Sequence, residues 1–466
     1  MSEVNTVAVF TARQIARAVG GRLLRGGEEM EASGVSTDSR TLAPGELFIP
    51  LIGPNFDGHG FIGKAEASGA AGALVERGRA FAGGEGFFLV EVEDTLRALG
   101  DLARFHRGRH EVTVAAVTGS NGKTTAKEMI ASIFAQGAET LKSEGNLNNL
   151  VGLPLQVLRL TPEHARAVFE MGMNQPGEIR RLAGIALPGI GVITNVGPAH
   201  LEGLGSVEAV REAKGELLEA MGARGRAVLS AEDPHSRLLA RRFREAGGEV
   251  LSFGFSRECG VQGDEVVVSP RGTSFRLRLN GAEARVRLPA LGRPNVLNAL
   301  AAAGAASLAG CTMEEIAAGL EGASIPKMRL EVRPLARREG CFLIDDAYNA
   351  NPASVLQALE VASQLRGGGR LFALLGDMKE LGRCAEEAHR EVGRAAARAA
   401  DFVAGVGPMM GRAVEEARRA GLAAEHFESP MAAAEWARGQ LRGGDWVLVK
   451  GSRSMRMERA IEVLEG

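Results

Sequence analysis

The segment from Ala115 to Met129, AAVTGSNGKTTAKEM, contains the residues with the clearest chemistry. It reads as a buried strand, a turn with two glycines, a Lys-Thr-Thr triplet and a helix. Backbone N–H groups of such a turn, together with the positive end of the helix, bind anionic phosphates. In this pattern Lys123 reaches the terminal phosphates and the hydroxyl of Thr124 binds Mg²⁺. The predicted phosphate loop consists of Gly119, Ser120, Asn121, Gly122, Lys123, Thr124 and Thr125.

This loop departs from the common pattern in one respect. The longer phosphate loop has glycine five residues before Gly122, where this chain has Val117. The segment is therefore the shorter T-G-x-x-G-K-T form. The alternative is an ordinary turn between strand and helix, but nucleotide binding is the interpretation that we favour.

Phosphoryl transfer also needs metal ligands and positive charge near the transferred group, and three later residues are candidates. Glu170 ends an apolar strand, where it is either a Mg²⁺ ligand or a plain turn acid. His200 follows the next strand and is otherwise a packed loop residue. Lys214 lies in a helix, where a lysine is usually on a solvated face. These residues gain weight as a set, because the carboxyl ends of parallel strands meet at one edge of a sheet.

A third group of polar residues follows strands near the C-terminus. The octapeptide DDAYNANP, Asp345 to Pro352, directly follows the apolar run CFLI and contains the only tyrosine of the chain, Tyr348. Pro352 is expected to open the next helix. Two further strand ends carry LLGDMKELG and KGSRSMRME; Asp377 in the first is either functional or a helix cap.

These residues need sheets to position them, and the rest of the chain supplies the pattern. Short β-branched runs alternate with helical stretches from Val112 onward, which predicts parallel sheets of the doubly wound kind. FRLRLNGAEARVRLPA reads as a hairpin that turns at Asn280–Gly281. We predict three α/β domains: a small N-terminal substrate domain (1–95), a central phosphate-loop ATPase domain (96–322) and a C-terminal Rossmann-like domain (323–466).

Composition excludes several classes of protein. A net charge of −2 gives no support for a nucleic-acid partner, and no apolar run reaches the length of a spanning helix. The first ten residues lack the pattern of an export signal. The cysteines Cys259, Cys311, Cys341 and Cys384 are scattered, which indicates reduced thiols in a cytoplasmic protein. We expect a monomer without a membrane span.

Taken together, the motifs resemble the ATP-dependent Mur ligases of peptidoglycan synthesis over essentially the whole chain. TGSNGKTT, Glu170, NVGPAHLE, AKGE and NVLNALAA occur in the order of that family. The resemblance implies that Thr124, Glu170 and His200 surround Mg²⁺ and that Asn295 and Asn298 lie against the nucleotide base. Lys123, Glu170, His200 and Lys214 would be catalytic. Some members carry the lysine that Lys214 matches as a carbamate; the sequence leaves its state open here.

The resemblance also implies the substrates. STDSRTLAPGELFIPLIGPNFDGHGFI is similar to the uridine-nucleotide domain of the family, and the matching positions are Ser36, Asp38, Ser39, Arg40, Asp57, Gly58 and His59. GNLNNLVGLPL, with Asn148 and Asn149, and DDAYNANP resemble the last-acting member, which adds D-alanyl-D-alanine to UDP-N-acetylmuramoyl-tripeptide through an acyl phosphate. Earlier-acting members carry a histidine where this chain has Asn349 and Asn351.

Roles in the C-terminal domain follow from that resemblance. Tyr348, Asn349, Asn351, Lys450 and Arg453 would contact the dipeptide, whose carboxylate suits the fork of an arginine; a surface ion pair is the alternative for Arg453. Arg329 would contact ATP when this domain closes. Asp345 or Asp346 would contact the nucleotide ribose. The sequence does not decide whether the third residue of the tripeptide is diaminopimelate or lysine.

Three rival functions are open at this point. Another amide ligase of the same fold would share the phosphate loop, but not the asparagines of DDAYNANP. A nucleotide-dependent switch would not need Glu170, His200 and Lys214 in order around the loop. A scaffold without activity would not need the loop at all.

Overall fold

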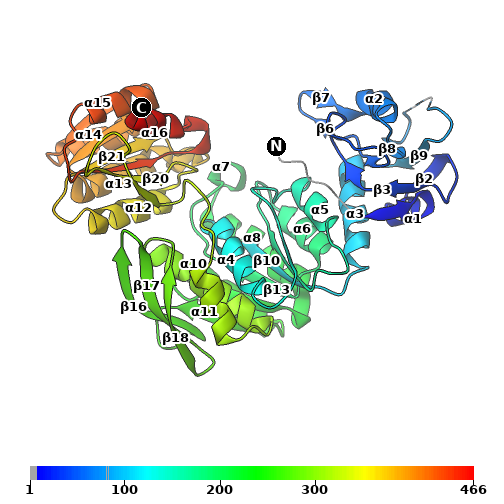
Figure 1. The fold of residues 1–466 in the computed structure, drawn as a ribbon, viewed down its shortest axis with the longest axis horizontal. Coiled ribbons are helices and arrows are strands. Elements are labelled where there is room, and N and C mark those ends of the chain that lie inside the picture. Colours follow the sequence, from blue (N-terminus) through cyan, green and yellow to red (C-terminus); the bar gives the residue numbers. More distant parts are fainter. Residues whose placement is uncertain (1–7, 80, 82) are drawn as a thin grey trace.

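The computed structural model describes residues 8–79, 81 and 83–466. Figure 1 shows three α/β units, with the N-terminal unit (blue) and the C-terminal unit (orange and red) at opposite ends of the central one. The predicted three-domain α/β architecture is confirmed. The boundaries at residues 95 and 322 stay predictions, and residues 1–7, where no export signal is expected, lie outside the described residues. No helix in the described part is long and apolar enough to cross a bilayer.

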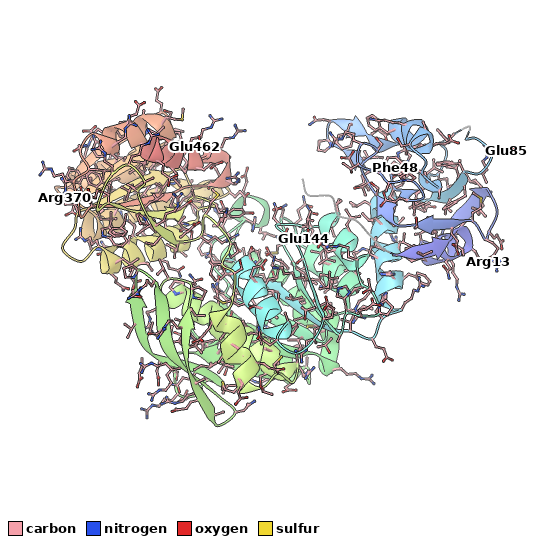
Figure 2. All side chains as sticks on the ribbon, in the orientation of Figure 1. Arg13, Phe48, Glu85, Glu144, Arg370 and Glu462 are labelled. Carbon is pink, nitrogen blue, oxygen red and sulfur yellow. The ribbon has the colours of Figure 1, made fainter. Side chains whose placement is uncertain are left out.

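The N-terminal unit is built on a five-stranded sheet of order β2-β9-β8-β5-β4, and Phe48 in its core, labelled in Figure 2, is 1% exposed. The elements are β1 (Val9–Thr11), α1 (Ala12–Ala18), β2 (Arg22–Arg25), β3 (Glu31–Ser33), β4 (Val35–Ser36), β5 (Leu47–Phe48), β6 (Ile52–Gly53), β7 (Phe56–Asp57), α2 (Ile62–Ala67), β8 (Gly72–Glu76), β9 (Phe88–Val92) and α3 (Thr95–Arg107). The segment GELFIPLIG is divided at Pro50 into β5 and β6, which belong to different sheets.

The central unit contains a nine-stranded sheet of order β11-β12-β10-β13-β14-β15-β16-β17-β18, parallel as far as β16. Its strands are β10 (Thr113–Thr118), β11 (Thr140–Lys142), β12 (Arg166–Glu170), β13 (Ile190–Ile193), β14 (Arg226–Ser230), β15 (Glu249–Gly254), β16 (Val261–Ser269), β17 (Gly272–Leu279) and β18 (Ala282–Leu288). The predicted hairpin is β17–β18, and its turn residues Asn280 and Gly281 both have positive φ, 53° and 78°.

The helices of the central unit cover both faces of this sheet. They are α4 (Lys123–Phe134), α5 (Gly152–Val157), α6 (Glu178–Ala186), α7 (Leu201–Leu204), α8 (Val207–Met221), α9 (Pro234–Glu245), α10 (Arg293–Leu308) and α11 (Met313–Glu321). The Ala-rich α10 is buried around most of its circumference, as expected for a tightly packed helix. Its small side chains let it lie close against the sheet: a Cβ on Gly304 would come within 2.9 Å of Val228.

The C-terminal unit contains a six-stranded sheet of order β19-β20-β24-β21-β22-β23, in which only the edge strand β19 is antiparallel. Its elements are β19 (Glu331–Pro334), β20 (Phe342–Asp346), α12 (Pro352–Leu365), β21 (Leu371–Gly376), α13 (Ala385–Ala399), β22 (Phe402–Val406), α14 (Met410–Arg419), β23 (Ala423–Phe427), α15 (Pro430–Arg438), β24 (Trp446–Lys450) and α16 (Glu458–Glu465).

Local signals fix several helix starts. Thr11 and Asn351 cap α1 and α12 with reciprocal side-chain and backbone hydrogen bonds, and Asp94 accepts from the N–H of Arg97 at the start of α3. Each cap satisfies an N–H group that the helix itself leaves without a partner. Pro352 occupies the first position of α12 as predicted.

Candidate functional site

A cleft of about 1110 Å³ lies where the carboxyl edges of the central and C-terminal sheets face each other. The phosphate loop, the end of β12 and the start of α10 line its central wall, while residues that follow β20, β21 and β24 line the C-terminal wall. Three side-chain contacts cross between the walls: Asn351 Nδ2 to Asn121 Oδ1 at 2.7 Å, Arg329 Nη2 to Thr124 Oγ1 at 3.1 Å, and His200 Nδ1 to Glu380 Oε2 at 2.8 Å.

The phosphate loop has no room for side chains at its two glycines. A Cβ on Gly119 would lie 1.9 Å from Thr194 Oγ1, and one on Gly122 would lie 2.1 Å from Asn298 Oδ1. Both glycines also have positive φ, and Gly122 precedes the first residue of α4. The backbone can therefore approach a phosphate closely, at the N-terminus of a helix.

Residues that follow β13 hold this loop in place. Asn195 accepts the N–H of Asn121 at 3.0 Å and donates to its carbonyl, which also receives the Thr194 hydroxyl at 2.5 Å. Ser120 Oγ bonds both the carbonyl and the N–H of Gly197. Thr194 and Asn195 were not singled out from the sequence, although Asn195 begins the motif NVGPAHLE and Thr194 directly precedes it.

Lys123 and Glu170 place opposite charges in the central wall. Lys123 Nζ donates to the Gly119 carbonyl at 2.9 Å, and its enclosure by the cleft lowers its pKa, an effect that Glu170 opposes. Glu170 is 2% exposed; Asn148 donates to its Oε1 at 2.8 Å, and its N–H donates to Ser143. Glu170 Oε2 is buried and has no hydrogen-bond partner in the described part of the chain. That orphaned oxygen is suited to a cation.

Lys214 is not on the solvated helix face where a lysine would ordinarily lie. It is 1% exposed. No described residue accepts a hydrogen bond from its amine, and no described carboxylate pairs with it. Burial lowers its pKa well below the ordinary value, and the positive charge of Lys123 lowers it further. Lys214 lies behind the cleft rather than on its surface.

The predicted base-contacting asparagines lie next to the loop on α10. Asn298 donates to Asn295 Oδ1 at 3.1 Å, and Asn295 donates to the Leu291 carbonyl at 2.9 Å. Both residues line the cleft and are 7% exposed. Nearby, Asn149 lines the cleft but its Oδ1 accepts the N–H groups of Val151 and Gly152 at the start of α5.

In the C-terminal wall most charges are already paired. Lys450 Nζ lies 2.6 Å from Asp346 Oδ2 and 2.9 Å from the Asn349 carbonyl. Burial raises the pKa of Asp346, while Lys450 acts in the opposite direction. The two candidate aspartates separate here: Asp346 lines the cleft, whereas Asp345 does not and lies 3.7 Å from Arg333.

Asn351 and Arg453 have contacts of their own. Asn351 Oδ1 caps α12 while its Nδ2 donates to the phosphate loop, so its side chain already makes two hydrogen bonds. Arg453 lines the cleft with a side chain that is 57% exposed, and it pairs with Glu458 at 3.1 Å.

Two residues near β21 are structural. Asp377 Oδ1 accepts the N–H of Met410, the first residue of α14, so it supports the start of a helix distant in sequence. His389 is buried and bonds the backbone of Met378 and Ala385.

The predicted uridine-nucleotide residues form a separate group in the N-terminal unit. Asp57 accepts the ring N–H of His59 at 2.7 Å, Arg79 pairs with Asp57 at 2.6 Å, and the other ring nitrogen of His59 accepts the N–H of Glu76. Asp38 pairs with Arg40, which lowers the pKa of Asp38 to about 2. Position 58 has room only for glycine, because a Cβ there would lie 2.7 Å from the backbone of Leu51.

The structure thus brings most predicted site residues to one cleft. Those that line it are Ser120, Asn121, Gly122, Lys123, Thr124, Thr125, Asn148, Asn149, Glu170, His200, Asn295, Asn298, Arg329, Asp346, Tyr348, Asn349, Asn351, Lys450 and Arg453. Those that do not are Gly119, Lys214, Asp345 and the group Ser36, Asp38, Ser39, Arg40, Asp57, Gly58 and His59. Sequence reasoning missed Lys379, Glu380 and Arg456 as cleft residues, although the first two lie inside the motif LLGDMKELG.

Comparison with known proteins agrees with this geometry. Family profiles match residues 31–107 (Mur ligase family, catalytic domain), 117–306 (Mur ligase middle domain) and 328–453 (Mur ligase, glutamate ligase domain). The UDP-N-acetylmuramoyl-tripeptide–D-alanyl-D-alanine ligase of Bacillus subtilis (strain 168) is 35% identical over 464 residues, which cover 97% of this chain and 98% of that protein. The chain belongs to the Mur ligase family.

Solved structures extend the likeness to the arrangement of the three units. A crystal structure of MurF from Acinetobacter baumannii matches with a TM-score of 0.90 and 32% identity, covering 99% of this chain and 100% of that one. MurF ligase from Thermotoga maritima, solved in complex with ADP, matches with a TM-score of 0.82 and 29% identity over 92% and 96% of the two chains.

Proposed function

We propose that this protein joins D-alanyl-D-alanine to UDP-N-acetylmuramoyl-tripeptide at the expense of ATP, giving the UDP-linked pentapeptide for peptidoglycan synthesis. The observation that carries the proposal is the shared cleft: the phosphate loop and the asparagine loop of residues 345–352 face each other and are joined by the hydrogen bond from Asn351 to Asn121. The full-length similarity to named D-alanyl-D-alanine ligases supports it.

The reaction is an activation followed by an acyl transfer. The tripeptide carboxylate attacks the γ-phosphate of ATP to give an acyl phosphate and ADP. The dipeptide amine then attacks the acyl carbon, loses a proton, and displaces phosphate through a tetrahedral intermediate to form the amide. The first step brings a carboxylate against the triphosphate, and the second develops an oxyanion and releases phosphate, so fixed positive charge is the main requirement. Lys123, Arg329 and the N-terminus of α4 supply it at the phosphate loop.

The residues also fit a magnesium ion. The described residues include no cluster of three His, Cys, Asp or Glu side chains of the kind that holds a metal without substrate. Mg²⁺ in nucleotide enzymes instead takes one or two protein ligands, phosphate oxygens and water. The orphaned Glu170 Oε2, with Thr124 and His200 beside it on the cleft, would hold the ion, which would neutralise phosphate charge when bound.

Lys214 and the N-terminal unit complete the proposal. Burial lowers the pKa of the Lys214 amine and so favours its neutral form, the form that reacts with carbon dioxide, and no described residue pairs with it; we propose that Lys214 is carbamylated. Ser36, Asp38, Ser39, Arg40 and the Asp57–His59 turn would bind the uridine nucleotide, with domains at 1–95, 96–322 and 323–466. We further propose a cytoplasmic monomer without a nucleic-acid partner.

One assay tests the function. The protein is supplied with UDP-N-acetylmuramoyl-tripeptide, ATP and Mg²⁺, and phosphate release is compared with D-alanyl-D-alanine, single amino acids and no acceptor. We expect release only with the dipeptide, together with a product heavier by one dipeptide. Release that is independent of the dipeptide would point to a nucleotide switch, and release with a single amino acid would point to another amide ligase of this fold.

A further inference from the structure

The arginine that crosses the cleft sits on a strained piece of backbone. Arg329 lies between Met328 and Leu330, which both adopt left-handed φ, 61° and 54°. Neither residue is a glycine, and bulky side chains rarely occupy that region unless surrounding contacts impose it. The conformation of residues 328–330 is therefore held from outside.

The contacts that hold it come from the loop after β20. Tyr348 donates its N–H to the Met328 carbonyl at 3.3 Å, and Leu330 donates its N–H to Asp346 Oδ1 at 3.2 Å. The guanidinium carbon of Arg329 lies 4.3 Å from the centre of the Tyr348 ring, within the range of a cation–π contact. Backbone and side chain are thus both seated on residues 346–348.

From this seat Arg329 reaches the other wall. Its Nη2 donates to Thr124 Oγ1 at 3.1 Å, and no carboxylate among the described residues pairs with it. Burial raises the pKa of Asp346 and the charge of Arg329 opposes that rise, but that carboxylate is the ion-pair partner of Lys450, and the Tyr348 ring is what contacts the guanidinium directly. An aromatic face can hold a cation without cancelling the charge that a phosphate needs.

We propose that Tyr348 is a positioning residue whose ring holds Arg329 against the phosphate loop, so that the C-terminal unit delivers this arginine to the terminal phosphate of bound ATP. The inference rests on the proposed function for the identity of the nucleotide, but the pairing itself does not. The Tyr348 hydroxyl makes no hydrogen bond within the described residues, so the ring face carries the contact. Phenylalanine should then replace tyrosine, and leucine should not.

The kinetic arm uses the full-length protein with Tyr348→Leu, Tyr348→Phe, Arg329→Met and the double change Tyr348→Leu/Arg329→Met. We expect Tyr348→Leu to lower kcat about tenfold with little change in the KM for ATP, since a half-buried cation–π contact, between the exposed and the desolvated case, is worth about one factor of ten. Tyr348→Phe should recover most of the loss, and Tyr348→Leu should cost little more once Arg329 is gone. Phe427→Leu, which replaces another half-buried aromatic ring of the C-terminal unit, in β23, is the matched control and should behave as wild type.

The spectroscopic arm needs no turnover. Because Tyr348 is the only tyrosine, protein labelled with 3-fluorotyrosine gives a single fluorine resonance. We expect that resonance to shift with Arg329→Met and to stay in place with Lys142→Met, a surface change. If the wild type lacks dipeptide-dependent activity but its resonance still differs from that of Arg329→Met, the proposed function is contradicted and the pairing of Tyr348 with Arg329 stands.

Three results would overturn the inference. The first is a resonance that Arg329→Met does not move. The second is additive kinetic losses in the double variant, which would mean that Tyr348 acts independently of Arg329. The third is a Tyr348→Phe loss as large as that of Tyr348→Leu, which would mean that Tyr348 acts through its hydroxyl.

Discussion

The two walls of the cleft handle charge in opposite ways. The central wall leaves its charges open: Lys123 meets only a carbonyl and Glu170 keeps a bare oxygen, and behind this wall Lys214 is buried without a partner among the described residues. The C-terminal wall pairs its buried charges, with Lys450 on Asp346 at 2.6 Å. Open charges in an enclosed site act on a ligand, whereas paired charges hold loops in place. The central wall is therefore built for the phosphate chemistry, and the C-terminal wall, with the exception of Arg329, pairs its charges to hold its loops in place.

The largest effect is expected when a charge of the central wall that has no ion pair is removed. Lys123→Ala should lower kcat by about a thousandfold or more, because one preorganised group at a developing charge is worth about 10²–10³ and Lys123 carries a full charge. The free energy of unfolding in urea should change little. Phosphate release measures kcat, and circular dichroism measures unfolding.

Lys142→Ala, on the surface with its side chain 45% exposed, is the control for Lys123→Ala. A Lys123→Ala protein that turns over at a near-normal rate would remove the phosphate loop from the mechanism.

Removing one charge of a buried ion pair should instead lower the free energy of unfolding. Lys450→Met leaves Asp346 buried without its cation, which costs about 3 kcal/mol of unfolding free energy. Urea denaturation at pH 7 measures that loss. Adding Asp346→Asn should restore part of the stability, and a double variant no more stable than Lys450→Met would show that the pair is not what holds the loops.

Arg453 tests the exception in the C-terminal wall, a cation that is largely exposed. Arg453→Ala should raise the KM for D-alanyl-D-alanine about tenfold with kcat nearly unchanged, the size of one charge-assisted contact. Glu458→Gln keeps the guanidinium but breaks its ion pair. Equal KM increases in both variants would mean that Arg453 serves only to hold α16.

The smallest effect concerns the N-terminal unit, where charges are paired at the surface. The N–H and ring of His59 hold the pKa of Asp57 at about 2, below its ordinary value, so the ionised form stabilises the fold. This contribution is complete above about pH 4 and is lost as the pH falls towards 2. Urea midpoints measured at pH 5 and pH 2.5 should differ less for Asp57→Asn than for the wild type, and an equal difference would exclude the linkage.

Sequence reasoning was strongest where a residue type has one chemical use. Glycines 119 and 122 and the lysine that follows them define a phosphate loop wherever a strand precedes and a helix follows, and the parallel sheet places Glu170 at the same edge. The residue types alone did not reveal that Lys214 is buried, because its helix has acidic and basic neighbours that suggest an exposed face. Nor did they separate Asp345 from Asp346, which are adjacent in sequence but point to opposite sides of β20.

Contacts between the central and C-terminal units could not be predicted from the sequence either. Asn351 was expected to face the dipeptide, yet its side chain caps α12 and reaches Asn121, 230 positions away. Glu380 pairs with His200 only because the loop after β21 meets α7 across the cleft. Such pairings depend on how two sheets are docked, which no local pattern encodes.

The contact between Gly122 and Asn298 has an evolutionary consequence. No side chain fits at Gly122 without displacing Asn298 of α10. The phosphate loop and the residue predicted to face the base are therefore packed in direct contact. A lineage could add a side chain at Gly122 only by changing Asn298 as well. A single-residue search for new nucleotide preferences in this protein would therefore have to leave Gly122 unchanged.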